Sequence, residues 1–340
     1  MGNLLAGLIV AGAAGTAQAS YIQYGAGMQT VLSGQVQNGG LYLQSASTWD
    51  NTTPIAGVNA PHAPTSATFL APACDSVVTA RLVMTVWGGT NAYTCGLGVT
   101  FNGTSVANLN MGATTDANPT FQGSQANVYG VGSGLWTVSV PVPTNLVKTD
   151  GSANSVLVSI DDPTMQFDGR VNQISLASVY QKASLNNSFH YMLAEGSGDI
   201  YKSQTGAPKS RTVSLGSADT SRLVSASLSA LYTYGDYGQN DRLYFNGVKL
   251  GSDDVANHQN NYTALNYVPD LISFDVAGSL AASNAVRFSV DSADGIPGTL
   301  ETSLRPTWAA LAVTQSVPEP GSLALLALGG VALLARRRRA

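Results

Sequence analysis

Short segments in which apolar and polar residues alternate, separated by turn-forming residues, fill the middle of the chain. This period-two pattern predicts strands over residues 24–36, 40–45, 75–87, 136–142, 155–161 and 174–181. Residues 96–106 form a predicted hairpin around Asn102-Gly103, because both residues tolerate the positive φ of a tight turn. Pro141 lacks a backbone N–H, so its strand is expected at a sheet edge. The body is therefore predicted to be all-β.

The same series of strands recurs in the second half of the chain. Ala226-Ser227-Leu228 corresponds to Ala80-Arg81-Leu82, and the turn Asn246-Gly247 corresponds to Asn102-Gly103. Residues 284–291 likewise match 154–161, and 309–315 match 175–181. We interpret the body as two tandem β-sandwiches of jelly-roll type, residues 20–185 and 186–316, between a signal helix (1–19) and a C-terminal hydrophobic helix within 317–340.

The repeated kernel is a strand ending in Phe-Asn-Gly, followed later by Asn-x-Val-x-(Phe/Val)-x-(Val/Ile)-Asp. It resembles galactose-binding-like jelly rolls attached to glycoside hydrolases. It is even more similar to an uncharacterised domain family of prokaryotic cell-surface proteins. The match is moderately specific, because the turn and core requirements of any jelly roll generate much of this kernel. Neither family supplies catalytic residues that can be carried onto this chain.

The C-terminus is a unit separate from the body. Two prolines at 318 and 320 prevent a helix from beginning before the apolar run 321–335, which ends in four arginines, Arg336, Arg337, Arg338 and Arg339. Fifteen helical residues span about 22 Å, less than the ~30 Å hydrocarbon core of a bilayer. The arginines keep their end in the cytoplasm, which places the body outside.

Pro318, Glu319 and Pro320, the short apolar helix and the basic end together resemble the PEP-CTERM sorting tail of Gram-negative bacteria. That resemblance implies recognition and removal of the tail by an exosortase, a membrane-embedded transpeptidase-like enzyme. It also implies a transient stay at the inner membrane, followed by delivery to the cell surface or extracellular matrix. An ordinary C-terminal membrane anchor is the alternative, and it exports the body too.

The N-terminus also indicates export. Residues 4–15 are an apolar h-region, and Ala17-Gln18-Ala19 before Ser20 is an A-x-A cleavage site. No Lys or Arg precedes the h-region, which departs from a standard signal peptide. The mature chain is expected to begin near Ser20.

Composition supports an exported β protein and excludes one class of partner. Charged residues make up only 11% of the chain, and Gly numbers 36. Without the four terminal arginines, 12 basic residues face 20 acidic ones, a net charge of −8, or −7 if Glu319 leaves with the tail. Nucleic-acid binding needs a basic face and is therefore not expected.

Cys74 and Cys95 are the chain's two cysteines. In an exported protein they favour a disulfide, with two buried thiols as the alternative.

No catalytic or metal-binding set is evident. Asp161-Asp162, Asp253-Asp254 and Asp291 follow strands, where aspartate commonly caps a turn, and adjacent acids on a strand point to opposite faces. The same turns offer oxygen ligands for Ca²⁺, but their spacing fits no known Ca²⁺ loop. The histidines at 62, 190 and 258 are scattered, and there is no nucleophile elbow or phosphate loop. We expect no enzyme activity and no cofactor.

Aromatic residues are the most suggestive binding feature. Trp87, Tyr93, Tyr232, Tyr234 and Tyr237 lie near polar residues, and such rings stack on sugars. Covering the end of a sandwich is the competing explanation.

Taken together, the sequence predicts an exosortase-sorted surface or matrix protein with a structural or adhesive role in biofilm or extracellular polysaccharide. A carbohydrate-binding module is the alternative, and a glycoside hydrolase using Asp161 or Asp291 is a third class.

Overall fold

A computed structural model describes most of the body of the protein. The described residues are 23–24, 27–48, 63–88, 93–111, 127–131, 134–162, 166, 169–196, 198–202, 207–235, 238–256 and 270–317. They form strands and four short 3-10 turns, η1 Thr144–Leu146, η2 Ala183–Leu185, η3 Ala277–Ser279 and η4 Ser292–Asp294. The predicted all-β fold class is confirmed, and both predicted terminal helices lie outside the described residues.

The first sandwich consists of a large and a small antiparallel sheet. The large sheet has the order β1–β8–β9–β5–β11–β3, made of Gln23–Tyr24, Asn127–Val131, Leu135–Val142, Ser76–Trp87, Arg170–Gln181 and Gly39–Ser47. The small sheet has the order β4–β10–β6–β7, made of Thr65–Phe69, Asn154–Asp161, Cys95–Phe101 and Thr104–Met111.

The second sandwich repeats this plan. Its large sheet has the order β18–β15–β20–β12–β2, made of Asp270–Asp275, Leu223–Tyr234, Ser303–Ser316, Asn187–Glu195 and Gln29–Gln37, and β13 (Ile200–Tyr201) also pairs with β20. Its small sheet has the order β14–β19–β16–β17, made of Ser210–Ser217, Ser283–Ser289, Arg242–Phe245 and Val248–Leu250.

The two sandwiches share one jelly-roll strand order. β9–β5–β11–β3 in the first corresponds to β18–β15–β20–β12 in the second, and β4–β10–β6–β7 corresponds to β14–β19–β16–β17. Each sandwich has its own core between its large and small sheets, because alternate side chains of every strand point inward. The most buried large members are Phe69, Phe101 and Trp136 in the first core and Tyr232, Phe245 and Phe288 in the second.

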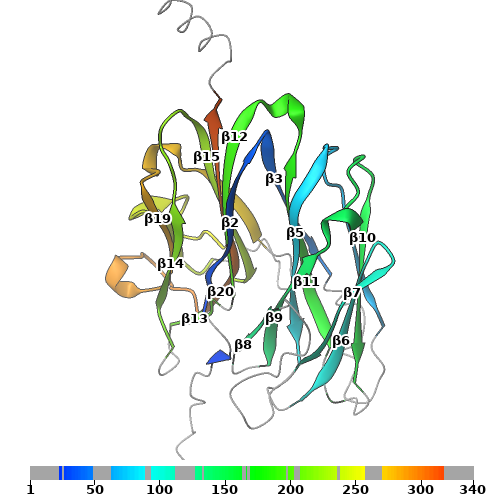
Figure 1. The fold of residues 1–340 in the computed structure, drawn as a ribbon. Helices are drawn as coiled ribbons and strands as arrows, with labels where there is room; N and C mark the ends of the chain where they lie inside the picture. The colour runs from blue at the N-terminus through cyan, green and yellow to red at the C-terminus, as the bar shows by residue number, and fades with distance from the viewer. Residues whose placement is uncertain are drawn as a thin grey trace, which may run out of the picture.

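The two large sheets pack against each other, so the protein has four β layers (Figure 1). We call this contact the seam. Its apolar centre contains Ala177 from the first sandwich and Leu193, Leu231, Trp308 and Ala310 from the second. Each large sheet is thus covered on both faces, which explains why β5, β11 and β20 are buried along most of their length.

One strand crosses between the sandwiches. β2 pairs with β12 of the second sandwich, although the chain enters β3 of the first sandwich after a single residue, Asn38. Asn38 adopts φ 55°, and its N–H donates to the carbonyl of Asn187 over 2.6 Å. The predicted boundary at residue 185 is therefore wrong for β2. The strands β2 and β3 are consecutive in sequence but belong to different large sheets. The left-handed backbone conformation of Asn38 turns the chain from one sheet to the other.

The repeated Asn-Gly kernel forms the same turn in both sandwiches. Asn102-Gly103 joins β6 to β7 with φ 47° and 81°, and Asn246-Gly247 joins β16 to β17 with φ 49° and 82°. The Asn102 amide N–H donates to Asn154 Oδ1 over 2.9 Å, as Asn246 does to Asn284 over 2.9 Å. These kernel residues therefore fasten the hairpin to the neighbouring strand.

Pro141 does not mark an edge strand as predicted, because β9 lies between β8 and β5. The pairing of β8 with β9 ends at Ser139, so Pro141 lies beyond the reach of β8 and interrupts no bond to it.

Candidate functional site

The strand that leads into the sorting tail lies inside a sheet. β20 pairs with β12 on one side and β15 on the other, and the strand ends at the top of Figure 1. Its last residue, Ser316, is exposed. We call this the tail-bearing end and the opposite one the far end. The predicted tail and cleavage residues lie outside the described residues: Pro318, Glu319, Pro320, Arg336, Arg337, Arg338, Arg339, Ala17 and Ala19.

No helix within the described part of the chain is long and apolar enough to cross a lipid bilayer.

A buried ion pair spans the seam. Arg81 of β5 donates from Nη2 to Glu195 Oε1 over 2.8 Å and from Nε to Oε2 over 3.0 Å, and Glu195 lies at the end of β12. The Glu195 side chain is 0% exposed and that of Arg81 9%. The Ser139 hydroxyl of β9 donates to Glu195 Oε2 over 2.5 Å. This bidentate geometry fixes the orientation of one sandwich on the other.

Further polar contacts continue across the seam. The hydroxyls of Thr85 and Thr233 lie 3.0 Å apart, and Thr233 donates to Gln173 Oε1 over 3.3 Å. All three side chains are buried. Sequence reasoning missed these residues as well as Arg81 and Glu195. An available signal was Arg81 itself, a charged residue in the middle of a predicted strand that is mostly apolar.

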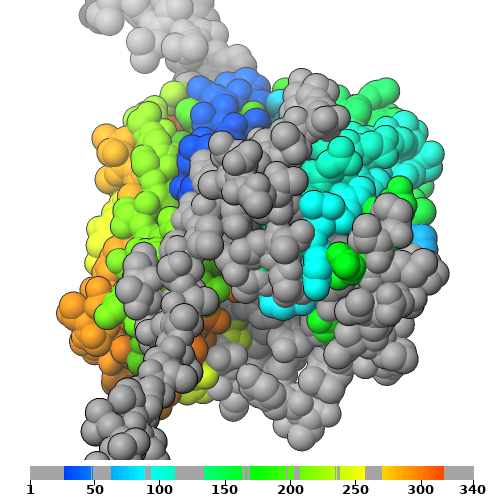
Figure 2. Space-filling model, turned by 90° about the horizontal axis from the view of Figure 1, so that it is seen from below, coloured from blue at the N-terminus to red at the C-terminus, as the bar shows by residue number. Residues whose placement is uncertain are grey.

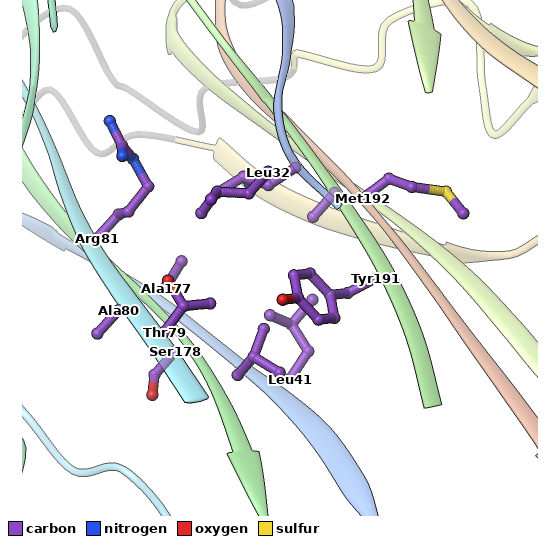
Figure 3. A pocket seen from close by; sticks show the side chains of 12 residues that line it. Leu32, Leu41, Thr79, Ala80, Arg81, Ala177, Ser178, Tyr191 and Met192 are labelled. Atoms are coloured by element: carbon purple, nitrogen blue, oxygen red, sulfur yellow. The ribbon is translucent and has the colours of Figure 1, made fainter. Parts of the chain in front are cut away.

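A narrow apolar cavity lies beside this ion pair. Leu41 and Ala177 line it from the first sandwich, and Leu32, Tyr191 and Met192 line it from the second. Figure 3 shows Leu41 and Tyr191 facing each other, while the Arg81 guanidinium points away from them. The cavity is a packing feature of the seam.

Strands β5 and β15 end at the far end of the protein. Figure 2 shows this end, with the first sandwich on the right and the second on the left. Trp87 ends β5 and is partly exposed, and Tyr93 is partly buried against the first core. The side chain of Tyr234 and all of Tyr237 lie outside the described residues.

Tyr232 is wrongly predicted as a sugar-stacking residue. It is 0% exposed, and its ring contacts Phe288 edge to face with centroids 5.6 Å apart. Its position in β15 places it on the core face with Ala230 and Leu228, two and four residues earlier.

The candidate acids occupy structural positions. Asp291 accepts a hydrogen bond from the Ala293 N–H over 3.0 Å and caps η4. Asp253 receives hydrogen bonds from Lys249 and Arg242 over 2.8 and 2.5 Å, which lower its pKa. Asp161 ends β10 in the other sandwich, so it and Asp291 do not flank a common site.

In the part of the chain that the structure describes, no three His, Cys, Asp or Glu side chains gather closely enough to hold a metal ion. His190 bonds through Nε2 to Gln315 Oε1 over 2.8 Å, and the other two histidines lie outside the described residues.

The predicted disulfide is absent, and both cysteines are free thiols. Cys74 lies just before β5 at the tail-bearing end, and Cys95 begins β6 at the far end. Twelve extended residues of β5 cover about 40 Å, whereas a disulfide needs Cα atoms within about 7 Å. Burial raises the pKa of both thiols, and for Cys95 the negative charges of Asp162 and Asp161 raise it further.

The body of two jelly-roll sandwiches leads directly into the C-terminal sorting motif. This arrangement places the protein in the class of exported and sorted proteins. A family model described as the PEP-CTERM protein-sorting motif matches residues 316–339, which indicates processing by an exosortase and sorting to the surface of a Gram-negative bacterium. A second model, "Protein of unknown function (DUF3344)", matches residues 23–314, and the chain belongs to this family. No curated protein matches the chain.

Two solved structures that match most of this chain are similar to it only at low sequence identity and low TM-score. The ANXUR2 extracellular domain from Arabidopsis thaliana is 8% identical with a TM-score of 0.25, and the match covers 82% of this chain and 91% of that one. PNGase F, a glycosylasparaginase from Flavobacterium meningosepticum, is 10% identical with a TM-score of 0.27, covering 81% and 96%.

Proposed function

We propose that this sorted surface protein is a structural and adhesive component of the extracellular matrix, acting among biofilm polysaccharide. The observation that carries this proposal is the route of the chain from β20 into the sorting motif. β20 is hydrogen-bonded on both sides along most of its length. Hydrogen bonds of antiparallel strands lie perpendicular to the strand, so a pull on the C-terminal end of β20 loads both ladders in shear. Such a strand resists extraction because many bonds must break together.

The seam supports the same role. The Arg81–Glu195 pair and the crossing strand β2 join the two jelly rolls into one body. Force applied at either end therefore passes through a continuous four-layer structure.

Deletion of the gene tests the matrix role. Biofilm of the deleted strain is expected to detach at lower shear, and the full chain should restore cohesion, whereas a chain lacking residues 318–340 should not, because it is not sorted. Unchanged cohesion after deletion of the gene refutes the role. Restoration by the tail-less chain shows that sorting is not needed for it.

We further propose that the far end is presented outward while the tail holds the protein at the inner membrane. Only Val317 separates Ser316 from Pro318, so the tail-bearing end must lie next to the membrane. Cysteines introduced at Thr94 and Ser184, in a Cys74→Ser background, report the two ends, and both positions are exposed. In cells without exosortase, a bulky maleimide should label Thr94→Cys and spare Ser184→Cys. Equal labelling contradicts the orientation.

Carbohydrate binding is a second candidate, favoured by the partly exposed Trp87 ring at the far end. Binding on a glycan array should fall at least tenfold in Trp87→Ala and remain unchanged in Tyr232→Phe, whose hydroxyl is buried. Equal binding by all three proteins refutes this candidate. The role proposed here is non-catalytic.

A further inference from the structure

Four acidic or phenolic side chains converge at the far end of the second sandwich. Tyr232 comes from β15, Asp241 immediately precedes β16, Asp254 follows β17, and Asp270 begins β18. Tyr232 and Asp270 are register partners on adjacent strands. We call this set the acidic corner. It lies outside the seam and does not contain the residues that support the proposed function.

Hydrogen bonding in the acidic corner is incomplete among the described residues. Asp241 Oδ2 accepts the Ala256 N–H over 3.2 Å, and Asp254 Oδ2 accepts the Gly238 N–H over 3.2 Å. The second carboxylate oxygen of each aspartate, and the Tyr232 hydroxyl, are buried without a hydrogen-bond partner in the described part of the chain. Asp241 and Tyr232 are both 0% exposed. A buried charge or polar group in this state is costly.

Cationic groups of the neighbouring strands are directed elsewhere. Arg242, the residue after Asp241, donates to Asp253 and to the carbonyl of Asp294. Arg287 pairs with Asp294 over 2.6 Å. Within the described part of the chain, the charges that act on Asp241 are those of Asp254 and Asp270, which have the same sign as its own. Protonation is the simplest way to remove one of these negative charges.

Burial is the largest influence on Asp241 and raises its pKa to about 7. The backbone N–H groups of Ala256 and Val255 oppose this shift, while Asp254 and Asp270 add to it. Burial also raises the pKa of Asp254, and burial together with Asp241 and Asp270 raises that of Tyr232. The negative charge of Asp270 therefore disfavours ionisation of the other three groups.

We propose that Asp241 is a proton-binding site through which the acidic corner responds to the pH outside the cell. With a proton on Oδ1, the Asp241 carboxyl group is neutral and becomes a hydrogen-bond donor, so the corner carries one negative charge fewer. Without it, a buried carboxylate faces two further carboxylates and the corner is destabilised. The protein is exported, so this group is exposed to the pH of the surroundings.

The sign of the effect follows from the direction of the shift. The pKa of Asp241 is higher in the folded protein than the ordinary value of 3.8, so its contribution to stability is complete below that value and is lost as pH rises to about 7. Between these limits the folding equilibrium constant should fall about tenfold per pH unit relative to a variant that cannot ionise.

The test is denaturant unfolding of the whole mature protein from pH 4 to pH 9 in the presence of EDTA. Asp241→Asn should remove this slope and be at least as stable as the wild type at pH 8. Asp253→Asn is the matched control, since it removes a nearby carboxylate that is already paired with Lys249 and Arg242, and it should keep the wild-type slope. Parallel curves for the wild type and Asp241→Asn overturn the proposal.

Two measurements on the wild type keep the test decisive if Asp241→Asn fails to fold. The ¹³Cγ resonance of Asp241 should titrate with a midpoint near neutrality, and a midpoint below pH 5 overturns the proposal. Millimolar Ca²⁺ without EDTA should leave stability at pH 8 unchanged. A stabilisation that requires Asp241 shows instead that a cation balances the charge.

Discussion

Removing one partner of the Arg81–Glu195 pair should loosen the attachment of the two sandwiches. Glu195→Gln keeps the shape of the side chain but leaves the Arg81 guanidinium buried without a counter-charge. Both side chains are at least nine-tenths buried, and two hydrogen bonds of 2.8 and 3.0 Å join them. Breaking such a pair costs about 3–5 kcal/mol, a large part of the 5–15 kcal/mol that stabilises a typical domain.

The double variant Arg81→Met, Glu195→Leu separates the cost of leaving one charge buried without a partner from the net contribution of the ion pair to the free energy of unfolding. Apolar residues of similar volume remove both charges, so the double variant should lie within about 1–2 kcal/mol of the wild type. Equilibrium unfolding in urea, followed by Trp308 in the seam and Trp136 in the first core, provides the assay. A cost below about 1 kcal/mol for Glu195→Gln, or purely additive single effects, refutes the account of the seam.

The remaining predictions concern the kernel, the core and the cysteines. Asn102→Ala and Asn246→Ala should each cost about 1–3 kcal/mol by urea unfolding, because each removes two side-chain hydrogen bonds to the adjacent strand; a loss in only one sandwich contradicts the equivalence of the two turns. Tyr232→Phe should be neutral or stabilising in thermal unfolding, because the hydroxyl it removes has no partner among the described residues, and a loss above about 2 kcal/mol contradicts this. Under denaturing, non-reducing conditions iodoacetamide should alkylate both Cys74 and Cys95, and an intact mass two daltons low with no alkylation would show a disulfide instead.

Local features of the fold could be predicted from the sequence. The Asn-Gly turns formed because a two-residue turn depends on its own φ angles, and the repeat preserved the order of the strands in both sandwiches. The crossing of β2 could not be predicted, because strand pairing between distant segments leaves no mark on local alternation.

The candidate site was harder to predict than the fold. Aromatic enrichment did not say which face of β15 each ring occupies, and alternation with Leu228 and Ala230 places Tyr232 in the core. A strand was predicted over residues 75–87, between Cys74 and Cys95, but the preference for a disulfide in an exported protein did not take the length of that strand into account. Arg81 indicated a buried ion pair, since a charged residue within a mostly apolar strand requires a partner. Its partner, Glu195, could not be identified from the sequence because it lies 114 residues away.

Mass mapping of both termini of the native protein tests the central claim most directly. The protein should be recovered from the cell surface or matrix with an N-terminus near Ser20 and without the arginines Arg336 to Arg339. Recovery from the cytosol with Met1 and Ala340 both present would contradict the account.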